Sequence, residues 1–196
     1  MKKYSLLIYL NLLNLFCLSQ KEANIWYFGE NAGLDFNSGS PLSLTNGQLS
    51  SEEGCASIAD SNGNILFYTD GSTVWNKNHS IMTNGTGLLG HFSSTQSAII
   101  IPKPGNSDIY YIITVAAIGW AQSPSYDGIN YSEVDMTLSN GNGAITSNKN
   151  IMLNQPSCEK ITAVSHANGS DIWLITHNWN SNSFLTYHVS QNGINT

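Results

Sequence analysis

Side chains that accept hydrogen bonds recur at matching places along this chain of 196 residues. Glu53 and Glu159 are 106 residues apart. Each is followed by an Asn-Gly step, and the asparagines of these steps, Asn62 and Asn168, are also 106 residues apart. Gln96 stands at a comparable place between Glu53 and Glu159. Two carboxylates across a channel could hydrolyse a glycosidic bond or hold a hard cation. Equal spacing is also typical of a repeated scaffold whose side chains hydrogen-bond neighbouring backbone, and we favour that interpretation.

A second set of candidates lies in segments rich in Gly, Asn and Ser, a composition that is typical of loops. The set consists of Asp70, Trp120, Tyr126, Asp127, His177 and Trp179. Aromatic rings beside carboxylate, imidazole and amide groups form binding surfaces when a rigid scaffold holds their loops. We expect this set to gather with Glu53, Gln96 and Glu159 on one face, around the mouth of a channel. We expect the opposite edge, with its tight Asn-Gly turns, to be bland.

Sequence motifs for catalysis, metals or cofactors do not appear. No serine stands in a Gly-x-Ser-x-Gly nucleophile elbow, and no Cys-x-x-Cys pair or histidine-rich cluster indicates zinc. The segment 125–131, SYDGINY, superficially resembles the Asp-box of sialidases, but Gly128 follows Asp127 directly and the spacing is wrong. We predict no catalytic residue, no metal and no cofactor, and we favour a protein that is not an enzyme.

Four apolar runs share one pattern and indicate the elements that position these side chains. They are NIWYFG (24–29), NILFYTD (64–70), DIYYIITV (108–115) and DIWLITH (171–177). We align Phe28, Tyr68, Ile113 and Ile175, which follow one another at intervals of 40, 45 and 62 residues, the last being lengthened by the insertion 116–130. Units of about 40–45 residues with several short strands are typical of propeller blades. The sequence therefore predicts an all-β fold, a β-propeller with blades of four-stranded antiparallel sheets.

Shorter runs supply the other strands of each blade. Strands that end in a turn precede the last three runs, as in CASIAD-SNGN, and Asn-Gly between apolar strands favours a hairpin. Runs that alternate polar and apolar residues follow at 34–36, 72–76, 131–138 and 183–189. We predict about four blades, at 20–51, 52–93, 94–156 and 157–196. Both end blades lack a strand, so we expect an incomplete propeller that is a fragment of a larger one.

The aromatic residues of these runs have two possible roles, packing between blades or forming a sugar-binding stripe. A strand in the middle of a blade is covered on both faces, so its side chains should be buried. We predict packing for Trp26, Tyr27, Phe67, Tyr68, Tyr110, Tyr111 and Trp173. The two end blades each lack a neighbour, so Trp26 and Trp173, or residues beside them, should be partly exposed. We therefore expect residues 20–196 alone to be marginally stable or to self-associate.

The first 19 residues have the features of a secretory signal peptide. Lys2 and Lys3 precede an apolar run, and Cys17 and Ser19 provide the small residues for cleavage after Ser19. The run is shorter than the ~20 residues that a membrane span needs. We predict a secreted or cell-surface protein whose mature chain begins at Gln20 and has no membrane span.

Charge and cysteine content restrict the partners further. After cleavage, five lysines stand against 13 acidic residues, and a nucleic-acid partner needs a basic surface that this chain lacks. Export permits a disulfide between Cys55 and Cys158. The repeat places these cysteines two blades apart, so we favour free thiols.

Several of these segments resemble the N-terminal propeller of large secreted proteins of Bacteroidota. The segments are NIWYFGENAGLDFNSGSP, EEGCASIADSNGNILFYTDGSTVWNKNH, STQSAIIIPKPG, YSEVDMTL and EKITAVSHANGSDIWLITHNW. The resemblance covers nearly all of the mature chain and implies an extracellular or cell-surface location. In that family, immunoglobulin-like modules of the polycystic-kidney-disease type commonly follow the propeller, and a gliding-motility-associated sorting domain for type IX secretion comes last. The resemblance supplies no catalytic residues, and the further blades, modules and sorting domain do not occur in this sequence.

These observations favour a non-catalytic recognition or adhesion module that binds an unknown surface glycan or protein through the loop face. Downstream modules of the same full-length protein would be its other partners. Two alternatives stay open: an extracellular hydrolase or lyase that acts on glycans or esters at the channel mouth, and a structural spacer.

Overall fold

The computed structural model describes residues 21–117 and 128–195, and this part of the protein is all-β. The predicted signal peptide lies outside the described residues. The first unit is a three-stranded antiparallel sheet formed by β1 (Ile25–Phe28), β2 (Ala32–Asp35) and β3 (Leu42–Leu44). The fourth unit is a four-stranded antiparallel sheet formed by β13 (Ser157–Ser165), β14 (Ile172–Asn178), β15 (Phe184–Ser190) and β16 (Gly193–Asn195).

Two further units lie between them in the chain. The second unit consists of β4 (Ala56–Ala59), β5 (Ile65–Thr69), β6 (Thr73–Asn76) and β7 (Ile81–Thr86). The third consists of β8 (Ala98–Pro102), β9 (Ile109–Val115), β10 (Ile129–Asp135), a 3-10 turn (Ser139–Gly141), β11 (Ala144–Ile145) and β12 (Ile151–Asn154). Within each unit the strands pair antiparallel, and one parallel pair, Ala144 with Thr83, links β11 to β7 and joins the two units into a nine-stranded sheet.

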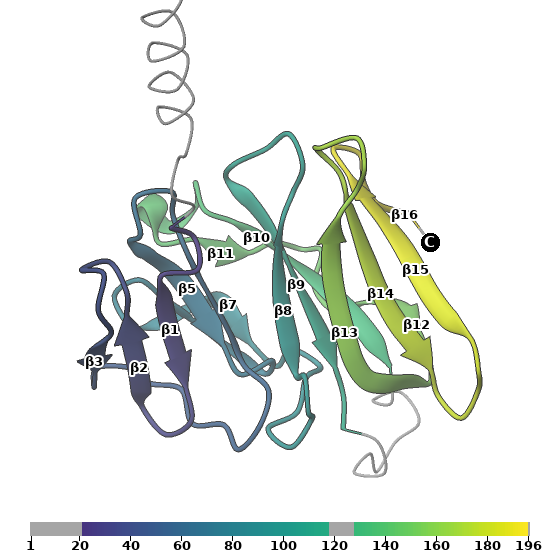
Figure 1. The fold of residues 1–196 in the computed structure, drawn as a ribbon, viewed down its shortest axis with the longest axis horizontal. Coiled ribbons are helices and arrows are strands. Elements are labelled where there is room, and N and C mark those ends of the chain that lie inside the picture. The colour runs from purple at the N-terminus through teal and green to yellow at the C-terminus, as the bar shows by residue number, and fades with distance from the viewer. Residues whose placement is uncertain (1–20, 118–127, 196) are drawn as a thin grey trace, which may run out of the picture.

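The four units follow one another across the molecule. In Figure 1 the purple strands β1–β3 lie on one side, β8 lies near the middle, and the yellow-green strands β13–β16 lie on the other side. The predicted apolar runs become β1, β5, β9 and β14, and the predicted hairpins become β4–β5, β8–β9 and β13–β14. Gly63 and Gly169 have positive φ in two of these turns, which explains the Asn-Gly steps.

Three apolar clusters fill the spaces between successive units. Tyr27 and Tyr68 stack between the first and second units, with ring centroids 4.5 Å apart. Phe67 meets Tyr110 edge-to-face between the second and third units, at 5.6 Å. Tyr111 belongs to a third cluster, with Ile113 from β9 and Leu174 and Tyr187 from the fourth unit. Packing between units is therefore confirmed for Tyr27, Phe67, Tyr68, Tyr110 and Tyr111.

The two tryptophans of the predicted packing set behave differently, because each faces away from the neighbouring unit. Trp26 is 49% exposed; its ring packs on Phe36 of its own unit, and its indole N–H donates to the Ala23 carbonyl at 2.7 Å. Trp173 is half-buried, and its ring contacts are with His166 and His188 of its own sheet. Inter-unit packing is wrong for these two residues, whereas the expected partial exposure of the end units is confirmed at both.

The sequence alignment of the apolar runs is displaced by one residue in the second unit. The β4–β5 pairing shifts so that Ala59 faces Ile65 whereas Ile58 faces Phe67, which leaves Leu66 as an extra residue. A β-bulge moves every later side chain of that strand to the other face. Tyr68 therefore corresponds to Ile112 and Leu174, which face the preceding unit. The aligned residues Ile113 and Ile175 lie on the opposite face of their sheets.

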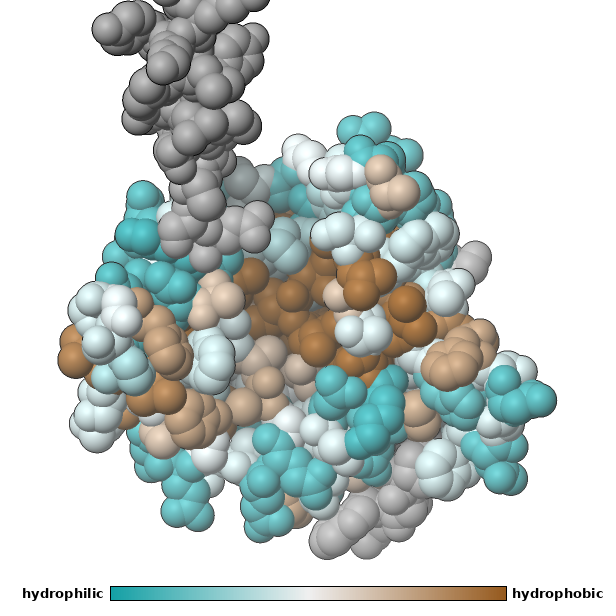
Figure 2. Space-filling model, viewed as in Figure 1, coloured by the Kyte–Doolittle hydropathy of each residue, from teal (hydrophilic) through white to brown (hydrophobic). Residues whose placement is uncertain are grey.

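Apolar side chains are also accessible on the face seen in Figure 2. Brown side chains gather there over β8 and β13, with teal side chains around them. Val164 of β13 is an exposed large apolar residue, and Ile99 of β8 is half-buried.

The cysteines and the possibility of a membrane helix can also be examined in the described part of the chain. Cys55 and Cys158 are free thiols. Among residues 21–117 and 128–195, no helix is long and apolar enough to cross a bilayer.

Candidate functional site

The predicted acceptors lie at one edge of the molecule, which we name the loop edge. It comprises residues 52–54, 70–72, 93–97, 158–161 and 177–183, where β4, β8 and β13 begin and where β5 and β14 end. Antiparallel pairing within each unit explains the arrangement, because the end of the second strand returns to the start of the first.

Gln96 and Glu159 tie the third and fourth units together at this edge. The Gln96 Oε1 atom accepts a hydrogen bond from the Ile161 N–H at 3.0 Å. The Glu159 Oε2 atom accepts hydrogen bonds from the Thr95 N–H at 2.9 Å and from the Thr95 hydroxyl at 3.1 Å. Both side chains thus bind backbone of the neighbouring unit, which is the role that the repeated spacing favours.

Glu53 lies beside this pair but is exposed. Its neighbour Gly54 donates its N–H to the Ser94 carbonyl at 3.1 Å. A Cβ at Gly54 would collide with the backbone nitrogen of Ser97, so only glycine allows this close approach. The structure therefore brings Glu53 next to the third unit without a hydrogen bond to its carboxylate among the described residues.

Asp70 holds its own turn through hydrogen bonds of its carboxylate. Its Oδ1 atom accepts hydrogen bonds from Ser72 N–H at 2.8 Å, from the Ser72 hydroxyl at 2.9 Å and from Thr73 N–H at 2.7 Å. The residue is buried, and its carbonyl accepts the Ser97 hydroxyl at 2.6 Å. The carboxylate of Asp70 thus organises the turn that follows β5.

His177 and Trp179 line two adjoining hollows at the loop edge. The first, of about 260 Å³, is bounded by Gln96, Ile161, Ile175, His177 and Phe184. The second, of about 590 Å³, is bounded by Cys158, His177, Trp179, Asn180, Ser181 and Asn182. His177 belongs to both hollows, and its ring packs edge-on against Phe184 at 5.0 Å. The remaining candidates, Trp120, Tyr126 and Asp127, lie outside the described residues.

The Cys55 thiol beside this edge is poorly suited to covalent chemistry. Burial raises the pKa of the Cys55 thiol, and the nearby Asp70 carboxylate raises it further. The Cys55 sulfur donates to the Tyr27 carbonyl at 3.5 Å. A protonated thiol is a weak nucleophile. Within residues 21–117 and 128–195, no three His, Cys, Asp or Glu side chains are grouped so that they could hold a metal ion.

The opposite edge, which the sequence marks as bland, contains a polar hollow of about 450 Å³. It is formed by the turns β8–β9, β13–β14 and β15–β16, and we name this side the turn edge. Little in the sequence indicates this hollow. The one visible difference is that the fourth unit's turn, HANGSD, has one residue more than the second unit's turn, DSNGN.

Comparison of the chain with protein-family models, with curated proteins and with solved structures finds no match.

Proposed function

We propose that this chain is a propeller-type recognition module of the extracellular space that binds a surface glycan at its loop edge. The propeller interpretation is supported by four successive units of antiparallel strands, each of which faces the next across an apolar cluster. The resemblance to secreted Bacteroidota propellers and the signal peptide belong to the same proposal. They supply the extracellular location and the expectation of further modules in the full-length protein.

The observation that carries the binding role is the environment of Trp179. Its indole is 47% exposed and shares a hollow with Asn180, Ser181 and Asn182. Aromatic faces bind the apolar face of a sugar ring, while amide and hydroxyl groups hydrogen-bond its hydroxyls. Glu159, one of the two carboxylates that could have served catalysis, is hydrogen-bonded to Thr95 of the neighbouring unit. Binding therefore fits this edge better than turnover.

A glycan array with matched tryptophan variants tests the proposal. Trp179→Ala should weaken binding at least about tenfold, which corresponds to about 1.4 kcal/mol. Trp26→Ala is the control, because Trp26 is exposed to the same degree but lies on the first unit. Equal binding by both variants, or binding of a protein partner and no glycan, would contradict the proposal. Turnover of a polysaccharide or ester that Glu53→Gln or Glu159→Gln abolishes would favour the hydrolase instead.

A further inference from the structure

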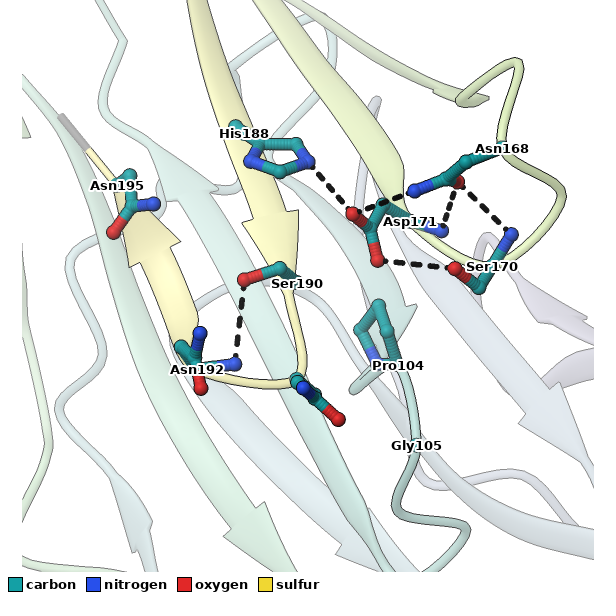
Figure 3. Close-up of a pocket in the computed structure, with 10 residues that line it drawn as sticks. Pro104, Gly105, Asn168, Ser170, Asp171, His188, Ser190, Asn192 and Asn195 are labelled. Carbon is teal, nitrogen blue, oxygen red and sulfur yellow. Dashed lines mark hydrogen bonds and ion pairs between the residues drawn. The ribbon is translucent and has the colours of Figure 1, made fainter.

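The polar hollow at the turn edge is built around one carboxylate. The Asp171 Oδ2 atom accepts a hydrogen bond from the Asn168 side chain at 2.9 Å and lies 2.9 Å from the His188 Nε2 atom. The Asp171 Oδ1 atom accepts the Ser170 hydroxyl at 3.3 Å. Figure 3 shows this network on one side of the hollow, with Ser190, Asn192 and Asn195 on the other side.

These contacts keep the Asp171 carboxylate ionised and leave it with spare acceptor capacity. The hydrogen bond from Asn168 lowers the pKa of Asp171; partial desolvation opposes this effect, and His188 and Ser170 add to it. An ionised carboxylate has about four acceptor positions, and three partners are present. The side chain retains 17% exposure, so a ligand can reach the fourth position.

The turn does not need this carboxylate for its own backbone. The Asn168 Oδ1 atom accepts the N–H groups of Ser170 at 3.1 Å and Asp171 at 3.0 Å. The His166 Nδ1 atom accepts the Asn168 N–H at 3.0 Å. The Asp171 carboxylate instead collects the side chains of Asn168 and Ser170 from its own turn and of His188 from β15, which gives the hollow a fixed polar wall.

The opposite wall carries hydrogen-bonding groups that are unused by the protein. Among the described residues, the side-chain amides of Gln191, Asn192 and Asn195 have no hydrogen-bond partner, and all three line the hollow. The Ser190 hydroxyl accepts the Asn192 N–H at 3.2 Å and keeps its own proton to donate. Gly105 closes the floor with a φ of +74°, and a Cβ there would lie 3.4 Å from Gln191.

The chemistry of this lining selects a ligand class. No lysine or arginine lines the hollow, so an anion has no strong partner there. Amide and hydroxyl groups that both donate and accept match the hydroxyls of a sugar, which do the same. A volume of about 450 Å³ is also in the range of small-molecule sites. We propose that the turn edge holds a second binding site, for one ring of a neutral sugar, with Asp171 and the amides of Asn192 and Asn195 as its hydrogen-bonding partners.

Titration of the purified full chain with glucose, galactose, mannose and N-acetylglucosamine, followed by saturation-transfer NMR, tests this proposal. At least one of these sugars should bind, and Asp171→Asn should weaken that binding at least tenfold. Asn195→Ala, at an exposed position that leaves the fold intact, should weaken it several-fold. Asp108→Asn removes the same charge from the same edge outside the hollow, and it should leave binding unchanged.

Two results would overturn the second site: no sugar of the panel binds, or both Asp171→Asn and Asn195→Ala bind like the wild type. The Trp179→Ala variant separates this site from the loop edge, since it should leave sugar binding at the turn edge unchanged. If Asp171→Asn fails to fold, as judged by circular dichroism, the Asn195→Ala result decides the question alone.

Discussion

The second and the fourth units are built on the same hairpin, but among the described residues only the second packs against another unit on each face. Phe67 of the second unit and Trp173 of the fourth occupy equivalent positions once the bulge at Leu66 is counted, and both point toward the side where the next unit would lie. Phe67 is fully buried against the third unit. The ring contacts of Trp173 are with His166 and His188 of its own unit. One repeat position thus has a packing role in one unit and a surface role in the other.

The turns of the two units differ in the same direction. In the second unit, the Asp60 carboxylate accepts N–H groups of Asn62 and Asn64, both at 2.9 Å. In the fourth unit, the His166 ring takes over the bond to the equivalent Asn168. Asp171, which follows the extra residue, is then free to gather side chains around a hollow. The repeat therefore fixes the backbone of the turn, while the residue that caps the turn decides whether a carboxylate remains for binding.

The largest expected effect separates the equivalent aromatic residues. Phe67→Ala should lower the free energy of unfolding by about 3–5 kcal/mol, the range for a large side chain removed from a packed core. Trp173→Ala should cost less than about 2 kcal/mol, because the indole already contacts solvent. Urea denaturation followed by fluorescence measures both. Equal losses of unfolding free energy would mean that Trp173 is packed as tightly as Phe67.

The exposed outer face of the fourth unit should cause self-association. Phe184 is 72% exposed on β15, and Val164 is exposed on β13 of the same sheet. Exposed apolar residues on one sheet favour association, so residues 20–196 should form dimers or larger species in sedimentation velocity at micromolar concentration. Phe184→Ser should shift the distribution toward the monomer.

Ile81→Ser is the matched control for this prediction. Ile81 is 57% exposed but lies on β7 of the second unit, so its replacement should leave the distribution unchanged. A wild-type chain that sediments as a single monomeric species would contradict the prediction, and it would show that the outer faces are tolerated in solution.

The strand pattern could be predicted from the sequence, but the facing of side chains could not. Apolar runs and Asn-Gly steps report period and turns, which is why β5, β9 and β14 lie where expected. The extra residue Leu66 is apolar like its neighbours, so nothing in the run reveals the bulge. The bulge alone decides that Tyr68 faces the first unit.

The candidate sites could be predicted to different degrees, depending on whether their residues share a place in the repeat or meet through strand pairing. Gln96 and Glu159 follow from the repeat, since Glu159 has the spacing of the Asn-Gly turns from Glu53 and Gln96 stands at a comparable place in the third unit. Asp171 and His188 meet because β14 pairs with β15, and this depends on the register set by the loop 179–183. The role of Asp70 depends on hydrogen bonds within three residues, which composition does not distinguish from a ligand site.

A smaller effect should distinguish the two turns. Asp60→Ala removes a carboxylate that caps its own backbone and should cost about 1 kcal/mol, a low value because the group is largely solvated. Asp171→Ala should change the unfolding midpoint less, because its turn is held by Asn168 and His166. Thermal unfolding of both variants checks the order, and the reverse order would contradict the division of roles proposed for the two carboxylates.

The smallest expected effect is the pH dependence of the second unit's turn. Burial raises the pKa of Asp60, but hydrogen bonds from the Asn64 side chain and from backbone N–H groups outweigh it, so the pKa lies below the ordinary value. A carboxylate whose pKa is lowered on folding stabilises the protein above its unfolded pKa of about 3.9, and this contribution disappears as the pH falls through the folded pKa. Asp60→Asn should therefore lose less stability than the wild type between pH 5 and pH 3, a window that spans the ordinary carboxylate pKa. Urea midpoints at the two pH values measure the difference. Parallel losses in both proteins would mean that the carboxylate of Asp60 contributes no pH-dependent stability, and that the hydrogen bonds of its turn are equally good with an amide.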